Sequence, residues 1–387
     1  MSVVGSAAVI DAERLRASFA AVAEHGDEVA LWFYSHLFLS HPAARGLFPL
    51  NMPRQRRRLL DALGHIVSRV DRLDELVPFL QQLGRDHRKF GTLAEHYPAV
   101  GQSLVSTLAH FSGSAWSMEL EADWRDAYDL VARTMIDAAS TAERVEPAWW
   151  DAEVIAHERR AFDVAVVRIR SLSPLAYRPG QSISVETDLA PKLWRFYSPA
   201  NAPRSDGAIE LHVQLIAGGP VSAALVRHLA VGDRVRLGAP LGHRLVLDPR
   251  SDRDLLLVAG GTGLAPLKAL VEQVAAEGGR RRVHLFHGAR TYPGLYDRAA
   301  LDKLAATNHW LRVTYALSQD AAPLGGEASS SPIGRGTVGE VAARAGEWQR
   351  HDVLVCGSPR MVARTVPLFA HAGIASDRIR FDEFTPR

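Results

Sequence analysis

Cysteine is almost absent from this 387-residue chain, and Cys356 is the single example. One cysteine excludes an internal disulfide and indicates a reducing compartment. Neither charge is in excess, because 45 basic residues oppose 43 acidic ones, which excludes the basic surface typical of nucleic-acid-binding proteins. No apolar run approaches the roughly 18 residues of a membrane span, and the first residues lack the pattern of a signal peptide. We therefore expect a cytoplasmic protein without a nucleic-acid partner or a membrane span.

The chain is too long for one ordinary hydrophobic core, so two or three domains are expected. Residues 1–145 have few glycines and prolines, and their apolar residues recur at helical spacing, as in Trp124, Tyr128, Val131 and Met135. A stretch with Pro147 and two tryptophans, residues 143–150, ends this pattern. It is the expected domain junction.

The remainder of the chain shows two further sequence patterns. From residue 151 to about 249, segments such as Val154–Leu172 and Ile209–Ile216 alternate in two-residue steps, which predicts a small antiparallel β-barrel. From residue 252 to 387, short apolar runs such as Leu255–Ala259 alternate with turns and helical patterns. That order predicts a doubly wound α/β domain with a parallel sheet. The predicted fold is thus multidomain: all-α, then β-barrel, then α/β.

The segment Arg195–Asn201 combines residue types that suit a flavin. An arginine can neutralise a diphosphate, a tyrosine ring can lie on a flat heterocycle, and a serine hydroxyl can reach a ring nitrogen. Here these are Arg195, Tyr197 and Ser198. The pattern resembles the flavin-binding strand of the ferredoxin-reductase superfamily. The competing interpretation is an ordinary strand with an exposed arginine.

A glycine-rich turn, Gly260-Gly261-Thr262-Gly263, follows the first apolar run of the α/β region and precedes a helix. Glycines allow a ligand close to the backbone, and a helix N-terminus favours an anion. The later hexapeptide Cys356–Met361 resembles the second nicotinamide motif of the same superfamily, and Gly218–Ser222 resembles its second flavin element.

The resemblance implies two sets of cofactor-binding residues. For FAD they are Arg195, Phe196, Tyr197, Ser198, Asn201, Gly219, Ser222, Asp382 and Phe384. For the nicotinamide nucleotide they are Gly260, Gly261, Thr262, Gly263, Cys356, Gly357, Ser358 and Pro359. Cys356 and Phe384 can instead be buried hydrophobic residues of the sheet. Asp320 would repel a 2′-phosphate, so NADH is expected, with NADPH as the alternative.

The helical region places a histidine on an apolar face. Leu80, Leu83, His87 and Phe90 follow one another at steps of three, four and three. Such an imidazole is more often a hydrogen-bonded core residue than a metal ligand. Earlier segments supply Tyr34, Phe48 in a Leu-Phe-Pro corner, and Gln55 with Leu59 on one face. An imidazole opposite a phenol and an amide suits haem with a diatomic ligand, although Tyr34 and Gln55 can also be polar groups of the helix surface.

The order of these residues, followed by Tyr97, a barrel and a nucleotide domain, resembles a flavohaemoglobin along essentially the whole chain. The resemblance implies that His87 ligates the iron of haem b and that Tyr34 and Gln55 face the bound ligand. It also implies that Phe48 and Leu59 crowd the haem and that Tyr97 supports the proximal side.

Two positions depart from the family pattern. The family carries a glutamate that hydrogen-bonds the proximal histidine, and this position falls on Ala139. The lysine usual before that histidine is Asp86 here. The loss of the glutamate should weaken the electron donation of His87 to the iron, whereas the acid at position 86 could partly replace the missing partner.

By resemblance, the chain is an NAD(P)H-dependent nitric oxide dioxygenase whose partners are O2, nitric oxide and NAD(P)H, with no obligatory protein partner. Electrons pass from NADH through FAD to haem, because a flavin accepts two electrons and releases them singly. The alternatives are an NADH oxidase, a reductase of other acceptors or an oxidiser of a small organic donor, a haem gas or redox sensor, and a reductase whose helical domain holds no haem.

Overall fold

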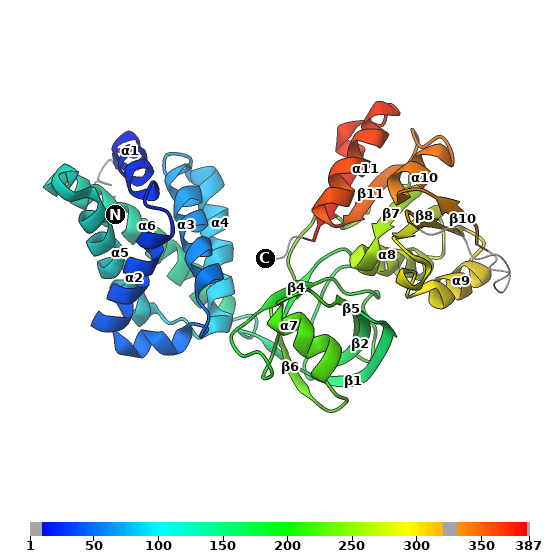
Figure 1. The fold of residues 1–387 in the computed structure, drawn as a ribbon, viewed down its shortest axis with the longest axis horizontal. Helices are drawn as coiled ribbons and strands as arrows, with labels where there is room; N and C mark the ends of the chain where they lie inside the picture. Colours follow the sequence, from blue (N-terminus) through cyan, green and yellow to red (C-terminus); the bar gives the residue numbers. More distant parts are fainter. Residues whose placement is uncertain (1–9, 320–330, 385–387) are drawn as a thin grey trace, which may run out of the picture. The chain divides into compact units, whose positions relative to one another are not determined.

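The computed structural model describes residues 10–319 and 331–384 (Figure 1). The chain divides into two compact units, and the boundary in the sequence falls between Trp149 and Trp150. This division lies within the segment 143–150, where the sequence predicts a domain junction. No helix in the described part of the chain is long and apolar enough to cross a membrane.

The first unit is built from α-helices. They are α1 (Ala12–Ala23), α2 (Asp27–Ser40), α3 (Pro53–Val67), α4 (Leu73–His87), α5 (Tyr97–Ser112) and α6 (Met118–Glu143). Sequence signals explain several helix starts: Pro53 occupies the first turn of α3, and the Ser117 hydroxyl accepts a hydrogen bond from the Leu120 amide at the start of α6. Their apolar faces enclose a large core that includes Phe33, Leu108 and Trp124, and a smaller cluster around Leu76, Leu80 and Met135.

Helices α4 and α6 approach each other very closely at Gly84. A Cβ atom on Gly84 would lie 2.3 Å from the carbonyl oxygen of Met135. A larger residue at position 84 would therefore separate the two helices. Gly84 lies three residues before His87, so this contact determines where the end of α4 lies.

The second unit begins with an antiparallel barrel. Its strands are β1 (Trp150–Ala161), β2 (Val164–Ser171), β3 (Ile183–Thr187), β4 (Arg195–Tyr197), β5 (Ala208–Gln214) and β6 (Arg234–Leu237), in the order β4-β3-β6-β1-β2-β5. A bridge between Pro199 and Leu211 links the segment after β4 to β5, which nearly closes the sheet into a barrel.

The rest of the second unit is a parallel sheet with helices. Its strands are β7 (Leu255–Gly260), β8 (Val283–Ala289), β9 (Leu311–Leu317), β10 (Ile333–Arg335), β11 (Asp352–Gly357) and β12 (Ile379–Glu383), in the order β10-β9-β8-β7-β11-β12. Its helices are α8 (Leu264–Ala276), α9 (Arg298–Thr307), α10 (Val338–Arg344) and α11 (Pro359–His371). The predicted fold class, all-α followed by a β-barrel and a doubly wound sheet, is confirmed.

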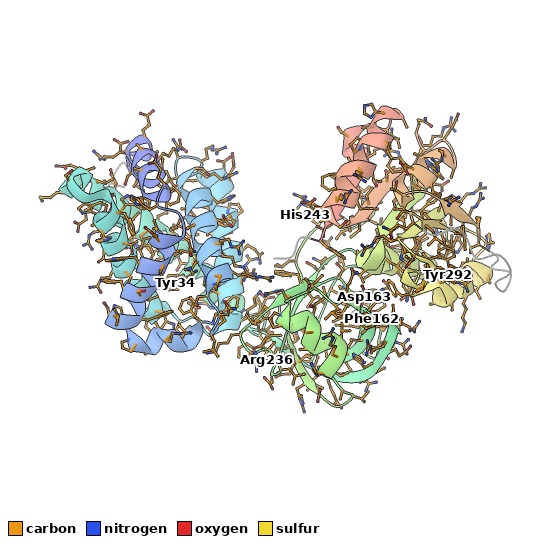
Figure 2. All side chains as sticks on the ribbon, in the orientation of Figure 1. Tyr34, Phe162, Asp163, Arg236, His243 and Tyr292 are labelled. Carbon is orange, nitrogen blue, oxygen red and sulfur yellow. The ribbon has the colours of Figure 1, made fainter. Side chains whose placement is uncertain are left out.

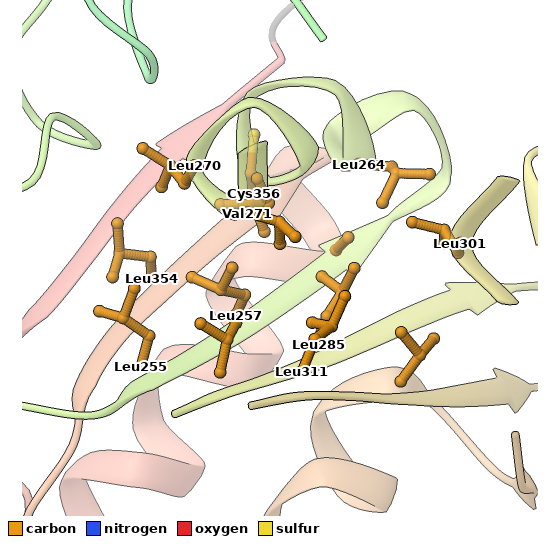
Figure 3. Close-up of a cluster of buried hydrophobic side chains, with 14 of the residues drawn as sticks. Leu255, Leu257, Leu264, Leu270, Val271, Leu285, Leu301, Leu311, Leu354 and Cys356 are labelled. Carbon is orange, nitrogen blue, oxygen red and sulfur yellow. The ribbon is translucent and has the colours of Figure 1, made fainter. Parts of the chain in front are cut away.

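The barrel and the parallel sheet share a hydrophobic core. Figure 3 shows its leucines on β7, β8, β9 and β11, covered by Leu264, Leu270 and Val271 of α8. Val164 and Val166 of β2 belong to the same cluster. This shared core explains why the two predicted domains form one compact unit.

Candidate functional site

His87 is the last residue of α4, and one of its ring nitrogens is already engaged. The Nδ1 atom lies 2.7 Å from the carbonyl oxygen of Leu83. A carbonyl oxygen only accepts, so Nδ1 carries the proton and Nε2 keeps a lone pair. Burial lowers the pKa of His87, which favours the neutral imidazole that a metal ion requires. The tautomer and charge of His87 fit an axial ligand of haem iron.

Tyr34 and Gln55 come together in the same helical unit. The Gln55 side-chain amide donates a 3.2 Å hydrogen bond to the Tyr34 hydroxyl. Tyr34 lies in the interior of this unit, 5% exposed, with its ring at 5.3 Å from that of Phe48 (Figure 2). Burial raises the pKa of Tyr34 to about 12. The hydroxyl therefore keeps its proton at neutral pH, and among the described residues nothing accepts that proton.

Phe48 and Leu59 pack, partly buried, against the core that contains Tyr34. Tyr97 packs in a second cluster with Leu80 and Leu83, the residue whose carbonyl binds His87. The Tyr97 backbone carbonyl accepts a 2.6 Å hydrogen bond from the Tyr128 hydroxyl. The structure thus groups Tyr34, Phe48 and Leu59 in one cluster, and places Tyr97 on the α4 side.

Among the described residues, no carboxylate hydrogen-bonds the His87 ring, although Asp86 acts on it through its charge. Ala139 lies on α6, while Asp137 and Glu143 of the same helix are exposed. Asp86 is 3.6 Å from Lys89 instead. The hydrogen-bond acceptor of His87 is therefore an uncharged carbonyl group.

The segment predicted to bind flavin forms β4 and the turn after it. Arg195 and Tyr197 occupy alternate positions on this edge strand, and Phe196 between them is 43% exposed. Tyr197 packs against the barrel core, and burial raises its pKa. Ser198 is buried. Arg195 and Phe196 thus lie on the edge strand of the barrel sheet, where a flat ligand can contact them.

The Asn201 side chain makes three hydrogen bonds within the protein. Its side-chain nitrogen donates to the carbonyl oxygens of Ala202 and Ala208, and its oxygen accepts from the Glu210 amide. These bonds hold the turn after β4 against β5. They engage both the amide nitrogen and the amide oxygen of Asn201.

Gly219 borders a hollow of about 490 Å³ that is also lined by Ile216, Gly218 and Arg227. The Ser222 hydroxyl accepts from the Ile216 amide and donates to the Gly219 carbonyl oxygen, at 3.0 and 3.1 Å. Ser222 therefore shapes the loop around the hollow. Arg227, which we did not anticipate from the sequence, adds a positive charge suited to a phosphate.

The two segments predicted to bind nicotinamide meet at one place in the parallel sheet. The chain runs from β7 toward β10 on one side and then returns to β11 on the other, so β7 and β11 flank the switch point of the sheet. Ligands of doubly wound sheets bind outside the carboxyl ends of strands at such a point. Gly260–Gly263 follows β7, and Cys356–Pro359 follows β11.

The contact between these segments is tight. A Cβ atom on Gly263 would lie 2.3 Å from the Cys356 carbonyl oxygen, and Gly261 has a φ of +55°. Thr262 is buried beside them. Ser358 accepts a hydrogen bond from the Met361 amide and caps α11, with Pro359 in the first turn. The N-termini of α8 and α11 thus both lie at the switch point, which is the expected nucleotide crevice.

Several other predicted residues surround the crevice. Cys356 is fully buried in the core, and burial raises the pKa of its thiol. Asp382 of β12 lies beside Cys356 of β11 in the register of the two parallel strands, and the Phe384 amide donates to the Gly357 carbonyl oxygen. Phe384 packs against the shared core. Asp320, on which the preference for NADH depends, lies outside the described residues.

Three regions of the chain match known domain families. Residues 31–135 match the globin family, residues 150–245 the oxidoreductase FAD-binding domain, and residues 257–366 the oxidoreductase NAD-binding domain. These domains assign haem, FAD and a nicotinamide nucleotide as the cofactors.

Relatives of known sequence match either nearly the whole chain or a part of it. A flavohemoprotein from Bacillus subtilis is 24% identical, with 97% of this chain and 96% of the relative covered. A reductase component of naphthalene dioxygenase systems from a Ralstonia species is 31% identical over 60% of this chain and 68% of the relative. The crystal structure of flavohemoglobin from Malassezia yamatoensis covers 98% of this chain and 100% of its own, with a TM-score of 0.73 at 19% identity.

The fold and these matches define an oxidoreductase that joins a globin to an FAD- and NAD-binding reductase. The chain belongs to the flavohaemoglobin family.

Proposed function

We propose that this flavohaemoglobin is an NAD(P)H-dependent nitric oxide dioxygenase that works in the cytoplasm and forms nitrate from nitric oxide and O2. Each nitric oxide loses three electrons and each O2 gains four, so one electron per turnover must come from the nucleotide. One NADH therefore supports two turnovers. The observation that carries the proposal is the hydrogen bond between Gln55 and the buried Tyr34, in a helical unit that also holds His87 as a neutral imidazole.

The cofactors divide the redox chemistry between them. When bound, haem provides a one-electron centre for O2 and nitric oxide, and FAD converts the two-electron hydride of NADH into single electrons. His87 Nε2 would hold the iron, with the Leu83 carbonyl fixing the ring. Phe48, Leu59 and Tyr97 would enclose the haem.

The proposed task of Tyr34 is to donate a hydrogen bond to the diatomic ligand. Its hydroxyl accepts from Gln55, so its own proton points elsewhere. A raised pKa keeps that proton in place at any physiological pH. Gln55 therefore acts as a positioning residue for Tyr34, and the exclusion of water by the surrounding rings strengthens the bond.

We further propose three domains: residues 1–145 for haem, 151–249 for FAD and 252–387 for the nucleotide. FAD would be bound by Arg195, Phe196, Tyr197, Ser198, Asn201, Gly219, Ser222, Asp382 and Phe384. The nucleotide would be bound by Gly260, Gly261, Thr262, Gly263, Cys356, Gly357, Ser358 and Pro359. The glycine-lined helix N-termini at the switch point support this assignment.

The test is rapid mixing of nitric oxide with the reduced protein in the presence of O2, followed by analysis of the product. We expect nitrate in a ratio of two per NADH consumed. Nitrite, nitrous oxide or peroxide as the main product would contradict the proposal. The His87→Ala protein should lose the Soret absorbance but keep the flavin spectrum, and retention of haem would show that His87 is not the ligand.

A second function deserves a test because His87 donates to an uncharged carbonyl group. A ligand with little anionic character pushes less electron density toward the iron. Such a protein would consume NADH and O2 without nitric oxide, as an NADH oxidase. Peroxide formed in the absence of nitric oxide, at a rate similar to that of nitrate in its presence, would favour this second function.

A further inference from the structure

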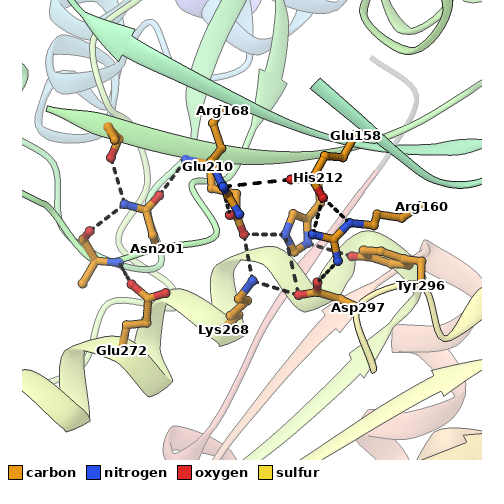
Figure 4. Close-up of polar contacts among 12 residues, drawn as sticks. Glu158, Arg160, Arg168, Asn201, Glu210, His212, Lys268, Glu272, Tyr296 and Asp297 are labelled. Carbon is orange, nitrogen blue, oxygen red and sulfur yellow. Dashed lines mark hydrogen bonds and ion pairs between the residues drawn. The ribbon is translucent and has the colours of Figure 1, made fainter. Parts of the chain in front are cut away.

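A cluster of charged residues, buried at its centre and partly exposed at its two arginines, joins the barrel to the parallel sheet (Figure 4). The barrel contributes Glu210 and His212 from β5, with Arg160 and Arg168 from β1 and β2. The parallel-sheet part contributes Lys268 from α8 and Asp297, which precedes α9. None of these residues belongs to the sites described above.

Lys268 lies at the centre of this cluster. Its ammonium donates to Glu210 at 2.7 Å and to Asp297 at 2.8 Å. Lys268 is only 6% exposed. Burial alone would lower the pKa of Lys268, but the two carboxylates outweigh it and raise that pKa. The ammonium is thus held as a cation in the interior.

The other members of the cluster complete its hydrogen bonding. His212 donates through Nε2 to Glu210 at 3.1 Å and accepts at Nδ1 from the Tyr296 hydroxyl at 2.8 Å. Arg168 bonds Glu210 at 3.0 Å and Arg160 bonds Asp297 at 3.3 Å. Each charged side chain of the cluster therefore has at least one partner of opposite charge, which is the condition under which buried charges are tolerated.

This arrangement has the donors of a metal site but already contains a cation. Glu210, His212 and Asp297 offer ligand atoms within 4.8 Å of one another. Lys268 bonds two of these three side chains. The Lys268 ammonium therefore takes the position that a metal ion would take. The ion pairs of Lys268, referred to as the tie, connect the barrel to the parallel-sheet part.

The tie connects the two regions between which hydride must pass. Lys268 lies one turn into α8, directly after the turn Gly260–Gly263. Glu210 lies on β5, where its carbonyl accepts from the Ala200 amide, three residues beyond Tyr197. The ion pair thus spans from the helix that carries the proposed nicotinamide turn to the strand beside the proposed flavin segment.

We propose that Lys268 is a positioning residue for hydride transfer: its bonds to Glu210 and Asp297 hold the nicotinamide crevice at the reacting distance from the flavin. The inference rests on the proposed NADH–FAD reaction but not on nitric oxide. In that reaction, the hydride carries two electrons and one proton to the flavin, and water supplies the second proton. Reaction rates fall steeply when reacting atoms are misplaced by about 1 Å.

The test measures anaerobic flavin reduction by NADH in the full-length protein with FAD bound. Lys268→Met should slow the limiting rate at least tenfold and change the NADH dissociation constant less than about threefold, as expected of misplacement rather than lost binding. The long-wavelength charge-transfer absorbance between NAD⁺ and reduced flavin should also weaken. Lys268→Arg should recover part of both signals.

Matched controls separate the tie from a general loss of stability. Arg204→Met removes an ion pair to Glu272 that also joins the barrel to α8 but is more exposed, and it should change the rate less than about twofold. The double variant Lys268→Met, Glu210→Gln removes the tie without leaving an excess of buried carboxylates, and it should be as slow as Lys268→Met.

A structural readout accompanies the kinetics. Hydrogen exchange of the turn 260–263 should accelerate in Lys268→Met, while exchange in the helical unit stays unchanged. Wild-type reduction rates in both Lys268 variants would overturn the proposal. A loss confined to NADH affinity would overturn it as well, because it would make Lys268 a binding residue. Both results are independent of whether the enzyme makes nitrate.

Discussion

At Tyr34, burial decides the chemistry of one hydroxyl group. The side chain is 5% exposed and accepts from Gln55, so its proton is free for a ligand. The same group on a helix surface would be hydrogen-bonded to water and would discriminate little between ligands. The chemistry of Tyr34 therefore depends on the packing around it.

Tyr34→Phe removes only this hydroxyl. We expect O2 to dissociate from the reduced protein about fivefold faster, because one hydrogen bond contributes about 1 kcal/mol. Stopped-flow or flash photolysis measures this rate. Tyr128→Phe, which removes a hydroxyl bonded to the Tyr97 carbonyl, is the control and should leave the rate unchanged. An unchanged rate in Tyr34→Phe would remove the proposed role of this residue.

The buried His287 should make the free energy of unfolding depend on pH. It is fully buried, its Nε2 donates to the Gly261 carbonyl oxygen, and burial lowers its pKa to about 4. A histidine of the unfolded chain binds a proton near pH 6.5, whereas His287 in the folded protein binds one only near pH 4. The free energy of unfolding therefore keeps its full value above pH 6.5 and decreases as the pH falls toward 4. Between pH 7 and pH 5, the loss is about 2 kcal/mol.

Hydrogen exchange of β8 at both pH values measures this loss as a change in the free energy of unfolding. His287→Gln keeps a donor for Gly261 but cannot titrate, so its pH dependence should be smaller by about 2 kcal/mol. His284, whose pKa burial lowers to about 3, remains as an internal reference in the same strand. Identical pH dependence in both proteins would contradict this assignment.

At the scale of elements, close approaches set the geometry of both candidate sites. Gly84 allows α4 to touch the backbone of α6 at Met135, which places His87. Gly263 allows α8 to start against the end of β11. In each case the absence of a Cβ atom lets two backbones come into contact, and this contact determines the position of a helix end at the candidate site.

Gly84→Ala should therefore weaken haem binding. The added Cβ would lie 2.3 Å from the Met135 carbonyl oxygen, and moving α4 to relieve this costs about 1–3 kcal/mol. Haem transfer to apomyoglobin measures the change, which should be about tenfold in haem loss. Gly64→Ala is the matched control, because its Cβ would only touch the Phe19 ring at 3.4 Å.

Gly263→Ala should damage the nucleotide crevice and leave the haem spectrum intact. Its Cβ would be 2.3 Å from the Cys356 carbonyl oxygen, so the glycine turn must move away from β11. We expect the KM for NADH in ferricyanide reduction to rise at least tenfold, because the backbone amides no longer face the diphosphate. Gly46→Ala, with nothing within 4 Å of its Cβ, should have no effect.

At the scale of the whole molecule, the protein has two compact units although three domain families match its sequence. The barrel and the parallel sheet share a hydrophobic core and the Lys268 cluster. Interfaces of this kind make two domains unfold as one.

Calorimetry of the full-length protein should accordingly show two unfolding transitions, one for the helical unit and one for the reductase. The second should respond to FAD and the first to haem, because a ligand stabilises the part that binds it. Three separate transitions would show that the barrel and the sheet unfold independently.

The fold class could be read from the sequence because helical spacing, two-residue alternation and buried apolar runs are local patterns. The sequence also leads to His87, Tyr34 and the glycine turn as candidate site residues, because short motifs carry the chemistry proposed for them. The Lys268 cluster was not. Glu210, His212 and Gln214 alternate on β5 as solvent-facing residues do, and Lys268 interrupts an apolar helix as a surface lysine would.

By itself, the sequence determined the order of domains, the cofactor motifs and the residue types that can bind iron, flavin and nucleotide. Only the tertiary structure decided which polar groups are buried, which nitrogen of His87 is free, and which charges pair across the reductase. The physical reason is that protonation and pairing depend on the groups that surround an atom in space. Those groups come from distant parts of the chain, as Lys268, Glu210 and Asp297 do.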